Sequence, residues 1–170
     1  MRQLTKIFLT ISLVFSLSAC GYGSEAETAK MGPVGNGIDT KIGEMRVQEI
    51  LVINDGTNAV LTAVLINTGD EAETLVGASV DNRLVKFVDT ASGVATEVGD
   101  VTISARSSVS LSFTAPLGAI VTNDTLPTAG SIVKVLFSFA NNGFVKSEAL
   151  VFANEDIYST ITPSAFALSN

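Results

Sequence analysis

The feature that most constrains this sequence is a two-residue alternation of apolar and polar side chains. In SVSLSFT (residues 108–114) every second residue is apolar, and in IVKVLFSF (residues 132–139) one complete face is valine or phenylalanine. Successive side chains of a strand point to opposite faces, so this period predicts strands with one buried face. No stretch of the body keeps a helical period over three turns. The alternation therefore predicts an all-β fold.

Turn residues divide the body into segments of strand length, which is typical of a β-sandwich or barrel. We expect strands at 46–53, 59–66, 73–80, 84–88, 94–98, 108–114, 132–140 and 144–152. AVLTAVLI (residues 59–66) is apolar on both faces, which favours a central strand. Asn142-Gly143 is a pair favoured in two-residue type I′ turns, and it predicts a closing hairpin. The predicted fold class is an immunoglobulin- or cupredoxin-like antiparallel β-sandwich.

The beginning of the sequence has the layout of a secretory signal peptide. Arg2 and Lys6 precede an apolar run at residues 7–17, which is shorter than the roughly 20 residues that a membrane-spanning helix needs. Leu17, Ser18 and Ala19 then precede Cys20, the only cysteine. This order is similar to a bacterial lipobox, in which the cysteine sulfur takes a diacylglyceryl group and the new N-terminus is acylated, commonly with palmitate. The alternatives are an ordinary signal peptide with a chance cysteine, or a free core thiol.

We therefore expect four segments: a lipoprotein signal peptide (1–19), the lipidated cysteine with a flexible linker (20–43), a β-sandwich domain (44–153) and a C-terminal tail (154–170). The linker is rich in Gly, Ser, Ala and Thr and has no apolar period, which is typical of a tether. The tail either lies against the domain through Ile157, Tyr158 and Phe166 or is loose. The predicted location is the extracytoplasmic face of a bacterial cell membrane, reached through the anchor at Cys20.

Charge excludes one class of partner. Without residues 1–19 the chain keeps 8 of its 10 basic residues and all 17 acidic ones, a net charge of −9. Nucleic-acid binding needs clustered Lys and Arg, so we expect no nucleic-acid partner.

One region resembles a known family. LTAVLINTGDEAETLVGASVDN (residues 61–82) is followed much later by Leu126-Pro127, Gly130 and the hairpin IVKVLFSFANNGFVKSEALVF. Over residues 46–152 this order is similar to the periplasmic copper chaperone family PCu(A)C, and most to its lipid-anchored actinobacterial branch. The resemblance implies a β-sandwich and copper handling through His and Met ligands, because imidazole nitrogen and thioether sulfur suit Cu(I).

The ligands of that family cannot be transferred to this chain. The sequence has no histidine, and its methionines are Met1, Met31 and Met45. APLGAIVTNDTLP (residues 115–127), where the resemblance would place ligands, contains none. We therefore expect no cofactor and no metal-binding residue.

Enzyme chemistry finds little support. A Ser–His–Asp triad is impossible without histidine, and Ser131 and Lys134 match Ser-x-x-Lys at the start of a strand, where they point to opposite faces. Asp70, Glu71 and Glu73 crowd one turn, and we interpret them as solvated turn acids, although calcium binding is the alternative. The sequence predicts no catalytic residue. It favours a non-catalytic binding or accessory module for an unknown envelope protein or ligand, with metal handling as the alternative.

Overall fold

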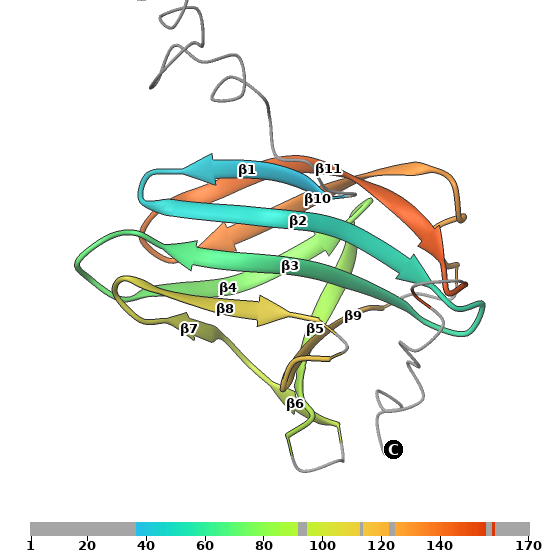
Figure 1. Cartoon of the computed structure of the whole chain (residues 1–170), viewed down its shortest axis with the longest axis horizontal. Helices are drawn as coiled ribbons and strands as arrows, with labels where there is room; N and C mark the ends of the chain where they lie inside the picture. Colours follow the sequence, from blue (N-terminus) through green and yellow to red (C-terminus); the bar gives the residue numbers. More distant parts are fainter. Residues whose placement is uncertain (1–36, 92–94, 113, 123–124, 156–157, 159–170) are drawn as a thin grey trace, which may run out of the picture. The chain divides into compact units, whose positions relative to one another are not determined.

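The computed structural model describes residues 37–91, 95–112, 114–122, 125–155 and 158. These residues form eleven strands (Figure 1): β1 (Ile38–Ile42), β2 (Met45–Asn54), β3 (Ala59–Asn67), β4 (Glu73–Val80), β5 (Arg83–Asp89), β6 (Thr96–Val98), β7 (Val101–Ile103), β8 (Ser107–Leu111), β9 (Leu117–Val121), β10 (Ile132–Phe139) and β11 (Gly143–Ala153). The all-β prediction is confirmed. Within this part of the chain, no helix is long and apolar enough to cross a membrane.

Hydrogen-bonded pairing closes eight of the strands into a ring, in the order β5-β9-β8-β3-β2-β11-β10-β4 and back to β5. The pair β4–β5 makes the closure through Ser79↔Leu84 and Val80↔Arg83. Two pairs in the ring, β2–β11 and β8–β9, are parallel. The predicted antiparallel sandwich is therefore wrong in its finer detail: the fold is a closed, mixed barrel. Parallel neighbours such as β2 and β11 are far apart in sequence, and strand periodicity does not identify them.

The barrel interior is filled by the apolar faces that the alternation predicted. On β10, Val133, Val135, Phe137 and Phe139 are all at most 3% exposed. Met45, at the start of β2, is also fully buried in this core. The interior thus consists of aliphatic and phenylalanine side chains from strands on every side of the ring.

Three strands were not predicted. β7 and β9 are short, and β9 lies within the segment where the family resemblance would place ligands. β1 lies within the predicted flexible linker, yet it pairs with β2 along Ile38↔Ile50 and Ile42↔Met45. A short strand added to an existing edge needs little apolar character of its own, so composition did not reveal it.

The closing hairpin β10–β11 is confirmed, but its turn differs from the prediction. Phe139 pairs with Gly143, so three residues form the loop, and only Gly143 of the predicted pair has a positive φ, at 80°. A glycine in this conformation after a three-residue loop is common in hairpins. The two-residue turn with positive φ at both positions is instead Asp81-Asn82, between β4 and β5 (φ 46° and 65°).

A second, smaller apolar cluster lies on the outside of the barrel. It consists of Val60, Val88, Ala95 and Ile120, and the first two alternate with barrel-core neighbours such as Leu61 and Phe87. Ala95 comes from the connection between β5 and β6, so a part of the chain outside the ring covers outward-facing apolar residues. The prediction that β3 is covered on both faces is confirmed in part, because Thr62, Val64 and Ile66 on the same strand are only half-buried.

Candidate functional site

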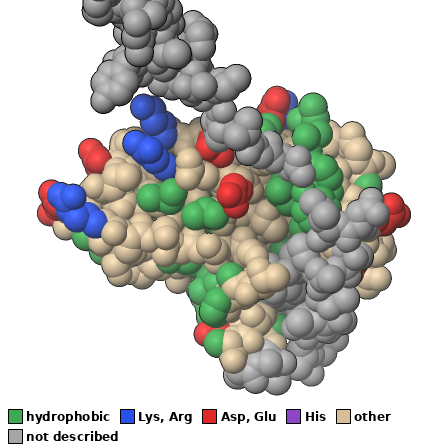
Figure 2. Space-filling view, viewed as in Figure 1, with side chains coloured by type: hydrophobic (Ala, Val, Ile, Leu, Met, Phe, Trp, Pro, Cys, Tyr) green, Lys and Arg blue, Asp and Glu red, His purple; other side chains and the backbone are tan. Residues whose placement is uncertain are grey.

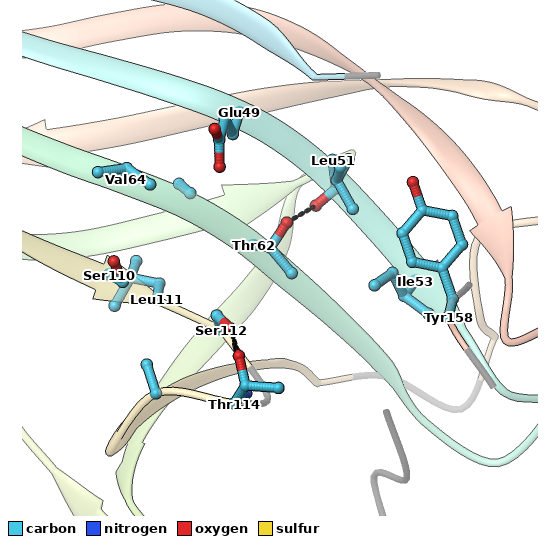
Figure 3. Close-up of a pocket in the computed structure, with 12 residues that line it drawn as sticks. Glu49, Leu51, Ile53, Thr62, Val64, Ser110, Leu111, Ser112, Thr114 and Tyr158 are labelled. Carbon is cyan, nitrogen blue, oxygen red and sulfur yellow. Dashed lines mark hydrogen bonds between the residues drawn. The ribbon is translucent and has the colours of Figure 1, made fainter. Parts of the chain in front are cut away.

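A groove runs over the outer face of β2, β3 and β8, beside this outer cluster. Its volume is about 310 Å³. Figure 3 shows Leu51 and Ile53 from β2, Thr62 and Val64 from β3, and Ser110 from β8 around it. In the space-filling view, apolar side chains interrupt the polar surface on this face (Figure 2). Strand residues that face away from a barrel core are ordinarily polar, so this surface differs from the pattern expected of a solvated face.

The apolar character of this face comes from two rows of residues that lie opposite one another across neighbouring strands. One row is Ile132, Leu150, Leu51 and Thr62, and the other is Phe152, Ile53, Val60 and Ile120. Cross-strand neighbours of this kind pack against one another. We call these eight residues, seven of them apolar and one a threonine, the outer apolar surface. It spans β10, β11, β2, β3 and β9, and the groove lies over its middle part.

One acidic residue stands at the groove in an unusual backbone conformation. Glu49 has a φ of 55°, the left-handed region that is uncommon for a non-glycine residue. The β2–β3 register shifts here, because Gln48 pairs with Val64 while Leu51 pairs with Thr62. This is a β-bulge, a feature that re-aims side chains. The carboxylate of Glu49 points toward the groove (Figure 3) and is the only charged group in its described lining.

The sequence carries a signal for this bulge that the strand prediction missed. Apolar core positions on β2 fall at Met45 and Val47, and then at Ile50 and Val52. The step of three between Val47 and Ile50 breaks the period of two, which requires one extra residue in the strand. Glu49 could have been identified as the bulged residue from this change of phase.

Strand β1 holds the bulge in place. Asp39 accepts hydrogen bonds from the Glu49 backbone N–H and the Gln48 side-chain amide, each at 3.0 Å. Gly37 packs directly against the Glu49 backbone, so that a Cβ atom at position 37 would collide with it. Residues that were predicted to belong to a flexible linker therefore position the acidic residue of the groove.

The groove is bordered by hydroxyl groups on one side and by an aromatic ring on another. Ser112 and Thr114 hydrogen bond through their hydroxyls at 3.0 Å, and the Thr62 hydroxyl donates to the Leu51 carbonyl at 3.4 Å. Tyr158 lies at the edge, with its ring 5.1 Å from the Phe152 ring and tilted by 42°. The groove therefore offers an apolar floor, a hydroxyl border and one carboxylate.

The acidic turn at residues 70–73 has a different role from the one expected. Glu73 is 2% exposed and belongs to the barrel end, where its carboxylate accepts the backbone N–H groups of Asn141 and Asn142 at 3.1 and 3.0 Å. The side-chain amides of both asparagines also donate to it, and so does Thr74 N–H at 2.7 Å. The prediction of a solvated acid is wrong for Glu73. A carboxylate in this position fastens the β10–β11 turn to the start of β4.

The surroundings of Glu73 act on its pKa in two directions. Burial raises the pKa, whereas the hydrogen bonds from Thr74, Asn142 and Asn141 lower it by stabilising the charged form. The net result is a pKa below the ordinary value for glutamate. Glu73 is therefore ionised at neutral pH and saturated with donors from the protein itself.

Most of the other residues named from the sequence cannot be placed in the fold. Leu17, Ser18, Ala19 and Cys20 lie outside the described residues, as do Ile157 and Phe166. Asp70 forms an exposed ion pair with Arg106. The described residues contain no group of three or more His, Cys, Asp or Glu side chains that could hold a metal ion.

The closed barrel has the fold of the PCuAC domains whose structures have been solved. The copper-bound PCuAC domain from PmoF2 is similar with a TM-score of 0.58 and 20% identity, over 68% of this chain and 98% of that one. The apo PmoF2 PCuAC domain has a TM-score of 0.58 and 19% identity, over 70% of this chain and 98% of that one. The apo PCuAC domain from PmoF1 has a TM-score of 0.56 and 18% identity, over 68% of this chain and 99% of that one. At this level of identity the likeness establishes the fold alone. No protein-family model and no curated protein sequence matches the chain.

Proposed function

We propose that this chain is a lipid-anchored, non-catalytic module of the bacterial cell envelope that binds an envelope protein or ligand on the outer face of its barrel. The observation that carries the proposal is the groove over Leu51, Ile53 and Val64, with Glu49 at its border. A concave groove with an apolar floor and a few polar groups at its border is typical of binding sites. The absence of histidine from the sequence excludes a Ser–His–Asp triad.

A pair of matched variants tests the groove as the binding surface. Val64 is half-buried in the groove, and Ser108 is an exposed residue of β8 that lies opposite Ile66, two residues further along β3. We expect envelope proteins that crosslink specifically to the wild-type chain to be lost with Val64→Lys and kept with Ser108→Lys. Equal recovery with both variants would show that partners bind elsewhere, and no specific partner with the wild-type chain would contradict the proposal.

The membrane anchor is proposed separately, at Cys20. Acyl chains on this sulfur and on its amine contribute about 0.8 kcal/mol per buried CH₂, and two or more chains are needed for stable anchoring. We expect Cys20→Ala to release the chain from membranes or to leave it unprocessed. Unchanged localisation and processing, or an unmodified thiol in the mass spectrum, would contradict the anchor.

Metal handling is the second candidate, because a copper-bound PCuAC domain has the same fold. The residues of this chain give it less support. Met45 is a thioether of the body, but it is fully buried in the barrel core. The remaining soft ligands by type are Met31 and Cys20, apart from Met1 in the proposed signal peptide. We expect a Cu(I) titration to give no stoichiometric complex at micromolar affinity. A complex of that affinity would reverse the order of the two candidates.

A further inference from the structure

The carboxylate of Glu49 is an acceptor without a partner at the border of the groove. The Glu49 backbone N–H donates to Asp39. Within the part of the chain that the structure describes, however, the carboxylate itself accepts no hydrogen bond and forms no ion pair. The other polar side chains of the described lining are hydroxyl groups and carry no charge. The described lining therefore has a negative charge that no residue in it neutralises.

Other exposed acids of the barrel do have basic partners. The ion pairs are Arg83–Asp81, Lys86–Glu97 and Arg106–Asp70. None of these six residues lines the groove. The difference matters when a partner covers the groove, because water then leaves Glu49 and an unpaired buried charge is costly. Favourable binding over the groove therefore requires a partner that brings a cation to Glu49.

The apolar surface around the groove is longer than a small ligand. Leu51 lies opposite Leu150, which in turn lies opposite Ile132, and the exposed fraction rises along this row from 9% to 37% and 63%. With Thr62 the row crosses four strands, a span of about 14 Å for strands about 4.8 Å apart. Exposed apolar side chains over this length suit contact with another protein, whereas small ligands are mostly enclosed in a pocket.

The charge of the chain favours the same kind of partner. The full sequence has a net charge of −7, and a negative protein attracts positively charged surfaces and raises their association rate. Arginine is enriched at the centres of protein interfaces, where its guanidinium pairs with a carboxylate in a forked geometry and packs against apolar surface. Lysine supplies the same charge without the fork.

We propose that the groove receives an arginine or lysine side chain of a partner protein. The cation donates hydrogen bonds to the Glu49 carboxylate, and the apolar side chains that flank it pack on Leu51 and Leu150. The bulge supplies the geometry, because it turns the carboxylate toward the groove (Figure 3). This inference rests on the proposed function and names the chemistry by which the partner is recognised.

Peptides that differ at one central position test this chemistry. The probes are Ac-Ser-Leu-Val-X-Val-Leu-Ser-NH₂, where X is arginine, glutamine or glutamate. Each is titrated into the isotope-labelled full chain carrying Cys20→Ala, and NMR follows the backbone amides of β2, β3 and β8. We expect the arginine peptide to shift the amides around the groove and to bind about tenfold more tightly than the glutamine peptide. The glutamate peptide should bind more weakly still.

Two matched variants assign the preference to one carboxylate. Glu49→Gln is expected to bring the arginine and glutamine peptides to within about twofold of each other in affinity. Glu71→Gln removes an exposed acid outside the groove lining and is expected to keep the tenfold preference. A preference that Glu49→Gln leaves intact, or one that Glu71→Gln abolishes equally, would overturn the proposal.

This inference and the proposed function can fail separately. Peptides that bind over the groove with equal affinity would overturn the inference and leave the binding function standing. Failure of all three peptides to shift the groove amides would also overturn it. The binding function is decided without any peptide, by the envelope proteins that crosslink to the wild-type chain and to its Val64→Lys and Ser108→Lys variants.

Discussion

Two glutamates of this barrel show how differently the same side chain is used. Glu73 lies at the start of β4, is 2% exposed and accepts hydrogen bonds from backbone and side-chain donors around the β10–β11 turn. Glu49 lies in β2, is exposed, and has its backbone and not its carboxylate held by Asp39. One carboxylate is saturated by the protein, and the other points toward a groove.

The difference indicates which part of the molecule is structural and which is available. Buried charged groups are retained where their donors are preorganised, because an unpaired buried charge is costly. At Glu49, by contrast, the backbone conformation costs free energy and the side chain is exposed. Strained residues of this kind cluster at functional sites. Glu73 therefore stabilises the barrel end, and the bulge at Glu49 is the better candidate for a binding role.

The largest expected effect on stability comes from removing the Glu73 carboxylate. Glu73→Ala removes the acceptor of several charge-assisted hydrogen bonds, and we expect it to lower the free energy of unfolding by about 2–4 kcal/mol. Urea denaturation measures the change. The matched control is Glu71→Ala, since Glu71 is exposed and only its backbone carbonyl is used, by Asn67. An equal loss of unfolding free energy in both variants would contradict the structural role of the Glu73 carboxylate.

The next effect concerns the support of the Glu49 bulge by β1. Gly37→Ala places a Cβ against the Glu49 backbone, and we expect a loss of about 1–3 kcal/mol together with faster hydrogen exchange at the Glu49 amide. Gly77→Ala is the control, because Gly77 is also a glycine of the barrel but has open space at its Cβ position. A tolerated Gly37→Ala would mean that the close packing of residue 37 does not support the bulge, and that the hydrogen bonds to Asp39 are its main support.

The ionisation of Glu73 gives a smaller effect that depends on pH. Its pKa is lowered in the folded chain, so its charged form stabilises the fold above the unfolded pKa of about 4.3. This contribution is lost as pH falls through the folded pKa. We expect the difference in unfolding free energy between the wild type and Glu73→Gln to be largest near neutral pH and to shrink below about pH 4. A difference that stays constant from pH 7 to pH 3 would contradict the assignment.

The smallest expected effect is at Glu49 itself. Because its φ is 55°, Glu49→Gly relieves backbone strain and should change the unfolding free energy by no more than about 1 kcal/mol, in the stabilising direction. Arg46→Gly, at an exposed position of the same strand with no positive φ, should instead destabilise by about 0.5–1 kcal/mol. Partner binding measured on Glu49→Gln then tests the carboxylate without changing the backbone. A large loss of stability with Glu49→Gly would show that this residue, like Glu73, is structural.

Much of the fold could be predicted because strand signals are local. The alternation in residues 132–139 placed four core residues of β10 correctly, and the Asn-Gly pair located the closing hairpin. The turn type was missed there because the Glu73 carboxylate, from a distant part of the chain, holds the Asn141 and Asn142 amides. β1 was missed because it takes its order from pairing with β2.

The candidate site was less predictable than the fold. The change of period between Val47 and Ile50 indicates the bulge. The groove, however, needs Leu51, Thr62 and Ser110 on one face, and these residues come from strands that pair only in the folded chain. The apolar row through Phe152, Ile53 and Val60 likewise depends on the parallel pairing of β11 with β2.

By itself, the sequence determined the local properties: strands with one apolar face, a body without histidine and a single cysteine after an apolar run. The tertiary structure alone decided that the sheet closes into a mixed barrel, that Glu73 is buried and that Glu49 points toward a groove. The physical reason is distance along the chain. Side-chain period and turn chemistry act between near neighbours, whereas ring closure, parallel pairing and the burial of a charge depend on residues that meet only after folding.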